Sequence, residues 1–363
     1  MIFASLISRP VRTLVSVLAV ALEVTMILVI VGLTTGIAKE SGRRIVGVGA
    51  DILLQGPNSS YMLALSSGTL PVAIGGKVKS DVPGVKAVAP VLLQTNSQGG
   101  LDLVYGIDPV SFEAVGGPFH FLDGQMFSKP GEIVVDDLYA RSKKLRPGAR
   151  IELLSQTFTV SGIVENGKGA RLFLPIGLAQ EMTGAANKAT LFYVKVDEGQ
   201  DVDAVKTAIE KFLQGYKVTR MSDLMSQMAP SKIPGLEPFL RTVVFIAVAV
   251  GVLVIFLSMY TTITERTREI GILRSLGASK TYIVVLIFEE SIVVCLLGVI
   301  VGVFASKMVA GTIVKVFPTL IVTMTAEWYL KAAGFALLSG IIGSFYPSLK
   351  AAKLDPIEAL AYE

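Results

Sequence analysis

The sequence predicts an α-helical membrane protein with four transmembrane helices and a large extracytoplasmic α+β domain inserted between helices 1 and 2. Its 363 residues are 52% hydrophobic and 17% charged, with a mean hydropathy of +0.63, which is too apolar for an ordinary soluble protein. Four apolar runs are long enough to cross a bilayer, whose core of about 30 Å needs ~20 helical residues. Between the first two runs, short β-rich stretches alternate with Gly, Pro, Asp, Asn and Ser.

The first expected span covers residues 13–38 and follows a short cytoplasmic N-terminus at residues 1–12. The run is apolar apart from Glu23 and is longer than the ~7–15-residue core of a signal peptide. Its outer end also lacks a good small-residue cleavage site, so we expect an uncleaved signal anchor. Arg9 and Arg12 precede the run and place the N-terminus in the cytoplasm.

Residues 39–235 are expected to form the extracytoplasmic domain, because short strands with a few helices make an α+β core. Apolar spacing predicts helices at 136–144 and at 201–213, the second with Asp201 as its N-cap. β-rich runs between turn signals predict strands at residues 50–54, 85–93, 101–107, 132–135, 151–154, 158–164, 172–174 and 191–196.

The residues of this domain show no recognisable catalytic or cofactor site. His120 lacks a nucleophile motif such as GxSxG and is interpreted as a structural loop residue. One His and one Cys, the apolar-run residue Cys295, are too few for a His/Cys zinc site. Asp136 and Asp137 suit the start of a helix, and a metal site there is the less favoured alternative. Without a P-loop motif or a concentrated basic face, we expect this chain to bind no nucleotide, other cofactor or nucleic acid.

Three further spans are expected after a stiff link at Pro230, Pro234 and Pro238. Span four is expected to end at Pro347, after an interfacial aromatic pair, Trp328 and Tyr329, near its start. The predicted segments are span two at 239–263, a cytoplasmic helix at 264–280, span three at 282–306, an outer loop at 307–326, span four at 327–349 and a cytoplasmic tail at 350–363.

The distribution of basic residues sets the expected orientation. The segment 264–280 carries four basic residues, and the tail carries Lys350 and Lys353. The loop between spans three and four carries only Lys307 and Lys315. We therefore expect both termini and the 264–280 segment in the cytoplasm of a bacterial inner membrane protein, with the large domain periplasmic or extracellular.

Polar and small residues inside the spans predict helix contacts. Glu23 lies mid-span, where a charge costs ~2.5–3.5 kcal/mol, so it should face protein or water. It is either a locally satisfied side chain at a helix interface, which we favour, or a functional polar contact at a lateral opening. The glutamates near the start of span three should reach the interface or neighbouring helices. Two GxxxG pairs favour close helix packing. The two glutamates are Glu289 and Glu290. The two GxxxG pairs are Gly32 with Gly36 and Gly298 with Gly302.

The charged segment 264–280 has the pattern of a short amphipathic helix. Ile270, Leu273 and Leu276 are spaced three apart, and Gly277 suits the helix end. Such a helix could lie in the lipid interface, or it could press its apolar side into a groove of a partner protein. Periodicity alone does not decide between these two interpretations.

Several motifs resemble the MacB/FtsX-type permeases, a class of ABC transporter membrane subunits. The run ERTREIGILRSLGAS and the ending YPSLKAAKLDPIEALAYE resemble the family's cytoplasmic helix and tail. The stretches DVPGVKAVAP, YGIDPVSF, GEIVVDDLYARSKKLRPGARI and FTVSGIV resemble its extracytoplasmic core. The resemblance covers nearly the whole chain in the same order.

The resemblance implies a homodimer or related heterodimer of permease chains working with two P-loop ATPase subunits, which would hold the ATP and Mg. MacB carries a fused ATPase ahead of its first span, so a chain beginning at the span implies a separate ATPase polypeptide. An extracytoplasmic adaptor or membrane fusion protein is a further expected partner. The segment 264–280 would be the coupling helix seated on the ATPase. Its expected contact residues are Glu265, Arg266, Arg268, Glu269, Ile270, Gly271, Leu273, Arg274, Leu276, Gly277 and Ala278.

Two functions follow from this resemblance. In the first, ATP-driven motion of the outer domain drives efflux or extracytoplasmic handling of a small molecule, peptide, lipid or lipoprotein. The alternative is an FtsX-like transducer that activates a cell-wall hydrolase and transports nothing. The outer domain of about 200 residues is larger than expected of an FtsX-type insert, which favours transport. In either case the chain itself would be a non-catalytic membrane subunit.

Overall fold

The computed structural model describes residues 10–355 except residue 58 and the segments 60–67, 97–101 and 228–234. Arg9, Pro230, Pro234 and the tail from Pro356 onward therefore lie outside the described residues. The chain divides into two compact units. The helical unit comprises Met1–Ile37, Pro234–Lys315 and Leu320–Glu363, and the sheet unit comprises Ala38–Ile233 and Val316–Thr319.

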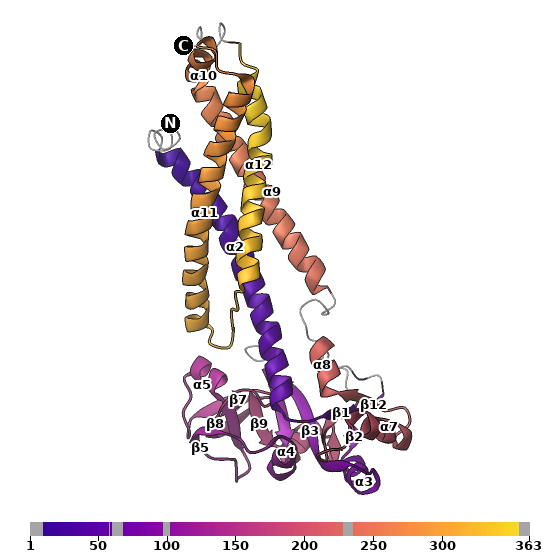
Figure 1. The fold of residues 1–363 in the computed structure, drawn as a ribbon. Coiled ribbons are helices and arrows are strands. Elements are labelled where there is room, and N and C mark those ends of the chain that lie inside the picture. The colour runs from indigo at the N-terminus through magenta and orange to yellow at the C-terminus, as the bar shows by residue number, and fades with distance from the viewer. Residues whose placement is uncertain (1–9, 58, 60–67, 97–101, 228–234, 356–363) are drawn as a thin grey trace. The chain divides into compact units, whose positions relative to one another are not determined.

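The long helices are apolar on nearly all sides, as expected of segments surrounded by lipid and by one another. Among the described residues, four are long and apolar enough to cross a membrane. They are α2 (Pro10–Gly47), α9 (Leu236–Glu265), α11 (Lys280–Val316) and α12 (Ala326–Ala352), with the short α10 (Thr267–Ser275) between α9 and α11 (Figure 1). The prediction of four long apolar helices with a mixed α/β domain between the first and second is confirmed.

Two helices are longer than the spans predicted from charge. α11 continues to Val316, so the expected outer loop at 307–326 is wrong over its first half. α2 likewise continues past residue 38 to Gly47. Charged side chains mark where a helix leaves the apolar layer, but they do not interrupt its backbone hydrogen bonds, and lysine and arginine extend toward water.

The prediction that span four ends at Pro347 is also wrong. Pro347 lies inside α12, which continues to Ala352 and so includes the first residues of the expected tail. A proline within a helix leaves the carbonyl of residue i−4 without its donor and needs room for its ring. Residue i−4 is here Gly343, which has no side chain, and Gly343, Ser344 and Pro347 are all buried. The small residues leave space for the ring.

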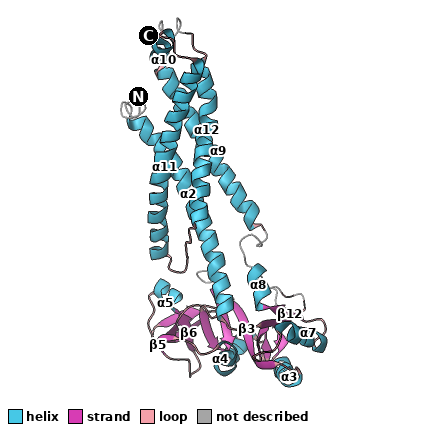
Figure 2. Ribbon diagram, in the orientation of Figure 1, coloured by secondary structure: helices cyan, strands magenta, loops and turns pink. Residues whose placement is uncertain are grey.

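The sheet unit is built on a large mixed sheet, and Figure 2 shows the strands of this unit in magenta. Its strand order is β12-β1-β11-β3-β4-β9-β6-β8-β5, with β7 paired to β8. The pairs β4/β9 and β6/β8 are parallel, and the other pairs of this sheet are antiparallel. The strands are β1 (Ile52–Gln55), β3 (Val85–Asn96), β4 (Asp102–Ile107), β5 (Phe121–Gly124), β6 (Glu132–Asp136), β7 (Arg150–Leu153), β8 (Gln156–Val164), β9 (Leu172–Pro175), β11 (Leu191–Val196) and β12 (Lys217–Arg220); β2 (Leu70–Pro71) and β10 (Lys188–Ala189) form a separate pair.

Helices cover both faces of this sheet. On β1, Leu53 joins one core cluster while Ile52 and Leu54 join another, as the alternation of side chains along a strand requires. The first cluster centres on aromatic residues, where the hydroxyls of Tyr105 and Tyr193 lie 3.0 Å apart. The helices of the unit are α3 (Ala73–Asp81), α4 (Pro109–Gly116), α5 (Asp137–Lys143), α6 (Ile176–Thr183), α7 (Val202–Phe212) and α8 (Met221–Gln227).

The two helices predicted in this unit, at 136–144 and 201–213, are present as α5 and α7. Their first turns are capped by aspartates. Asp136 accepts a hydrogen bond from the Tyr139 amide at 2.6 Å, and Asp201 accepts one from the Asp203 amide at 3.1 Å. These bonds satisfy backbone donors that have no partner within the helix.

Candidate functional site

The short helix α10 joins two spans through a break at each end. At its start, Arg266 leaves the helical conformation with φ −103° and ψ 16°. Past its end, Gly277 has φ +96°, a left-handed conformation that glycine adopts without steric cost. The Ala278 amide donates to the Leu273 carbonyl at 3.0 Å, which satisfies a carbonyl of the last turn. The chain is therefore built to turn sharply on both sides of these nine residues.

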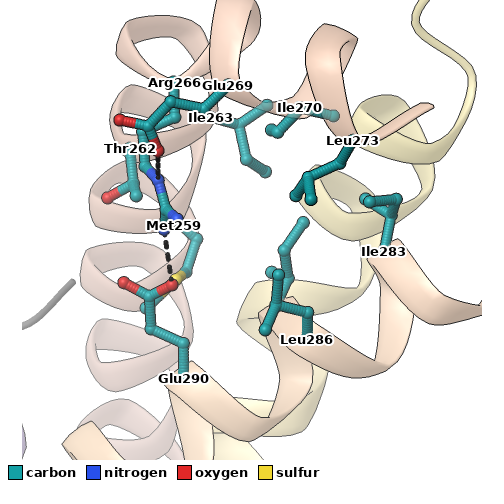
Figure 3. A pocket seen from close by; sticks show the side chains of 11 residues that line it. Met259, Thr262, Ile263, Arg266, Glu269, Ile270, Leu273, Ile283, Leu286 and Glu290 are labelled. Carbon is teal, nitrogen blue, oxygen red and sulfur yellow. Dashed lines mark hydrogen bonds and ion pairs between the residues drawn. The ribbon is translucent and has the colours of Figure 1, made fainter. Parts of the chain in front are cut away.

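Arg266 fastens α10 to the span that follows it. Its Nε donates to Glu269 Oε2 at 2.8 Å, and its Nη1 donates to Glu290 Oε2 at 3.1 Å (Figure 3). The Glu290 side chain is only 10% exposed, so little water screens this second pair. One guanidinium group thus bridges the α9–α10 junction and α11.

Beside this ion pair, α9, α10 and α11 enclose a mainly apolar pocket (Figure 3). Arg266, Glu269 and Glu290 form its charged part. The remaining lining residues are Met259, Thr262, Ile263, Ile270, Leu273, Ile283, Leu286 and Ile287.

The apolar residues of α10 do not share one outward face, contrary to the sequence interpretation. Ile270 is 7% exposed, and both it and Leu273 pack into the apolar core of the helical unit. Gly271 is buried as well. Leu276 lies beyond the helix end and is 80% exposed, and Ile272 is 44% exposed. A three-residue spacing advances 300° around a helix, so Ile270 and Leu273 can face inward while Ile272 faces outward.

The remaining residues predicted to contact a partner also differ in their exposure. Arg268 and Glu269 are exposed, as is Gly277, whereas Arg274 and Ala278 are half-buried. Glu265 forms an ion pair with Arg12 of α2. Arg12 also donates to Thr262 Oγ1 at 3.3 Å, so the start of α2 is tied to the end of α9. The sequence indicates Arg12 only as a charge that sets orientation. Its pairing with Glu265 was not predictable, because the two residues lie far apart in the sequence and no local pattern links them.

The predicted intramembrane glutamates occupy three different environments. Glu290 belongs to the pocket, whereas Glu289 is exposed. Glu23 is 4% exposed and accepts a hydrogen bond from Ser339 of α12 at 2.8 Å. A Cβ at Gly251 of α9 would lie 2.0 Å from Glu23 Oε2, so this glycine makes room for the carboxyl group. Glu23 therefore joins three helices, and Gly251 is not among the residues that the sequence predicts for this contact.

The two GxxxG pairs pack against different kinds of partner. A Cβ at Gly298 would lie 2.5 Å from Val20 Cβ, and Gly302 is as close to Ala21 and Val24, so this pair lies against α2. At Gly36, a Cβ would lie 1.7 Å from the carbonyl oxygen of Ile321. Gly32 accepts a hydrogen bond from the Thr323 amide at 2.8 Å. Gly32 and Gly36 thus contact the extended segment before α12, and the expected helix–helix contact for this pair is wrong.

Within the described part of the chain, no group of three or more His, Cys, Asp or Glu could hold a metal ion. The features that converge at α10 are an ion-paired hinge, an apolar pocket and exposed side chains. Nothing in the arrangement of these groups resembles a nucleophile paired with a base.

Comparison with known proteins gives two matching family models. The model described as MacB-like periplasmic core domain matches residues 13–212, more than half of the chain. The model described as FtsX-like permease C-terminal matches residues 241–356, which include α10 and its flanking spans.

Individual relatives match at low identity. The chain is 25% identical over 407 residues to "Macrolide export ATP-binding/permease protein MacB" of Bdellovibrio bacteriovorus, covering 99% of this chain and 61% of that protein. It is 25% identical over 261 residues to "Uncharacterized ABC transporter permease YknZ" of Bacillus subtilis, covering 67% of this chain and 63% of that protein. The chain thus spans less than two thirds of either relative. The crystal structure of the periplasmic region of MacB from Actinobacillus actinomycetemcomitans aligns with 51% of this chain and 95% of that one, at 12% identity and a TM-score of 0.39.

Proposed function

Because this chain belongs to the family of MacB/FtsX-type ABC transporter permeases, we propose that it couples ATP hydrolysis by a P-loop ATPase to motion of its periplasmic-type domain. The family match and the four long apolar helices make this chain a multi-pass membrane protein. In our proposal both termini and α10 lie in the cytoplasm. The basic residues around α10 support this orientation, since Arg266, Arg268 and Arg274 gather there.

α10 is the proposed coupling helix, and the observation that carries this proposal is the division of its two sides. The inner side, with Ile270 and Leu273, is fixed to the spans of the same chain. The outer side, together with Leu276 just past the helix end, presents Arg268 and Ile272 to the surroundings. An exposed pair of large apolar side chains flanked by charge is a suitable anchor for a cleft in another protein.

The Arg266 bridge supports the transmission of force. A helix held loosely would yield when a partner moved, whereas an ion-paired junction moves as one body with α9 and α11. The bridge joins α10 to both spans through Glu269 and Glu290. ATP-driven closure of the ATPase subunits would therefore displace the spans together with α10.

The proposed assembly is a dimer of permease chains with two ATPase subunits, which bind the ATP and Mg, and with an extracytoplasmic adaptor. YknZ is named a permease alone, whereas MacB is named an ATP-binding/permease protein. In either organisation, we propose that α10 contacts the P-loop ATPase. The proposed activity is export or extracytoplasmic handling of a substrate, since the MacB relatives are named macrolide exporters. These names do not favour the alternative of a hydrolase-activating transducer.

Two aspartate substitutions on the outer side of α10 test the proposal. The tagged full-length chain would be purified from membranes of its host, and co-purifying P-loop ATPase subunits identified by mass spectrometry. Ile272→Asp with Leu276→Asp is expected to remove the ATPase, because a charge cannot enter an apolar cleft unpaired. Both side chains are already exposed, so the substitutions should leave folding intact.

The matched control is Val110→Asp. Val110 is 79% exposed, as Leu276 is 80% exposed, but it lies on α4 in the sheet unit. This variant should retain the ATPase. Equal retention of the ATPase by both variants, or its absence from the wild-type protein, would overturn the proposal.

A further inference from the structure

The sheet unit contains a group of buried and half-buried ionisable side chains that neither α10 nor the spans use. Arg171, which precedes β9, lies at its centre and is 8% exposed. Around it are Asp136 of β6, Asp102 of β4, and Glu40 and Arg44, one turn apart on the outer end of α2. We call these five residues the Arg171 cluster. All of them belong to the sheet unit.

Arg171 connects this cluster to a segment far away in the sequence. Its Nη2 donates to the Thr319 carbonyl at 2.9 Å. Thr319 belongs to the short stretch Val316–Thr319, which begins at the last residue of α11 and is part of the sheet unit. The cluster therefore gathers the outer end of α2 and the segment after α11 onto the sheet.

Several buried atoms of the cluster have no hydrogen-bond partner among the described residues. They are Glu40 Oε1, Arg44 Nε, Asp136 Oδ2 and Arg171 Nη1. The neighbouring Asp137 differs, because its carboxylate pairs with Arg141 at 2.6 Å and accepts hydrogen bonds from Asn166. Buried polar atoms without partners destabilise a fold unless water, a proton or an ion completes them.

The charges of the cluster do not balance. Three carboxyl groups, on Glu40, Asp102 and Asp136, face two guanidinium groups, on Arg44 and Arg171. One proton on a carboxyl group would make the numbers equal. Asp136 is the best placed to take it, since it is 1% exposed and its Oδ2 has no partner in the described chain. The other groups near Asp136 and Asp102 are Asp137, Tyr139 and the exposed Lys143.

We propose that the Arg171 cluster is an acid-strengthened latch. Protonation of Asp136 balances the buried charge and thereby fastens the Glu40–Arg44 turn of α2 and the Thr319 segment to the sheet. The latch is independent of the coupling role proposed for α10, because all of its groups belong to the sheet unit and α10 belongs to the helical unit.

The direction of the pH dependence follows from the surroundings of Asp136. Burial raises the pKa of Asp136 from 3.8 to about 6, against the hydrogen bond from Tyr139 and the attraction of Arg171. Burial raises the pKa of Asp102 as well. A carboxyl group with a raised pKa binds its proton more tightly in the closed cluster than in water. The proton therefore stabilises the closed cluster fully at pH below 3.8, and this stabilisation is lost as the pH rises through about 6.

Hydrogen–deuterium exchange of the full-length chain in detergent micelles tests the latch. Peptides covering residues 38–47 and 316–319 would be followed between about pH 5 and about pH 7.5, after correction for the intrinsic exchange rate. The wild-type protein is expected to show about tenfold greater protection at the lower pH, with the protection beginning to rise as the pH falls through about 6.

Asp136→Asn separates the latch from a purely structural aspartate. Asparagine can still cap α5, but it cannot ionise. The variant should keep high protection at both pH values, above that of the wild type at about pH 7.5. Asp203→Asn, at an exposed aspartate paired with Arg220, should behave as the wild type. A flat wild-type profile, an unchanged pH dependence in Asp136→Asn, or an Asp136→Asn protein that unfolds would each overturn the proposal.

Discussion

Arg266 is the residue that ties α10 to its neighbouring spans. It marks the end of α9, forms an ion pair within the first turn of α10 and reaches Glu290 on α11. Its side chain is 21% exposed and that of Glu290 is 10% exposed. Removing one partner of such a pair leaves a poorly solvated charge, which is the expensive way to break an ion pair.

Arg266→Ala should therefore lower the free energy of unfolding by about 1–3 kcal/mol. A lowered Tm of the purified chain in detergent would report this loss. Arg241→Ala is the matched control, because Arg241 also lies on α9 but pairs with Glu237 at 78% and 50% exposure. An exposed pair contributes about 0–1 kcal/mol, so that variant should change Tm little. Equal Tm shifts in the two variants would contradict the role given to Arg266.

At the scale of single residues, the sequence predicts where charged residues lie better than it predicts which residues they contact. The charges of the 264–280 segment and the glutamates of span three could be located, because they interrupt long apolar runs. The pairing of Arg266 with Glu290 could not, since it depends on how α10 folds back against α11. The space that Gly251 leaves for Glu23 depends in the same way on the packing of α2 against α9.

α2 is the element whose glycines show most clearly how the helical unit is packed. Gly36 touches the backbone of Ile321, and the Thr35 hydroxyl donates to the Thr323 carbonyl at 3.0 Å. Gly42, less than two turns further along the same helix, has no atom within 4 Å of an added Cβ. α2 thus contains one glycine with no room for a side chain and one with open space where a side chain would be.

Gly36→Ala should destabilise the chain by about 1–3 kcal/mol, because the Ile321 carbonyl is backbone and cannot rotate away. Gly42→Ala should instead stabilise it by about 0.5–1 kcal/mol, since alanine has the better helix propensity. Thermal unfolding of both variants in detergent would compare them directly. A Tm that rises for both would show that Gly36 is not in contact with the 321–323 segment.

The existence of the long helices was predictable from hydrophobicity, while their ends were not. α11 continues through Lys307 and Lys315 because these side chains extend toward water without disturbing the backbone. α4 was missed even though Asp108 and Pro109 form a recognisable start, with Asp108 accepting from the Ser111 amide at 3.0 Å. Its eight residues are too few for a periodic pattern to stand out.

For the whole molecule, the sequence predicted the class and the order of its parts. A change from apolar runs to β-rich stretches and back is visible in composition alone, and the two family models match in that same order. The ten-stranded sheet, with its parallel β4/β9 and β6/β8 pairs, was not predictable, because strand order depends on contacts between distant segments. The Arg171 cluster was hidden for the same reason.

The central claim is that the outer side of α10 contacts a P-loop ATPase, and site-specific crosslinking tests it most directly. Cys295 is the single cysteine of the chain, so Cys295→Ser gives a background into which Leu276→Cys or Val110→Cys can be placed. A reagent that joins the new thiol to nearby lysines would be applied to membranes, and the crosslinked partner identified by mass spectrometry. A crosslink to the ATPase is expected from position 276 and none from position 110. No crosslink from position 276, or equal yields from both positions, would contradict the claim.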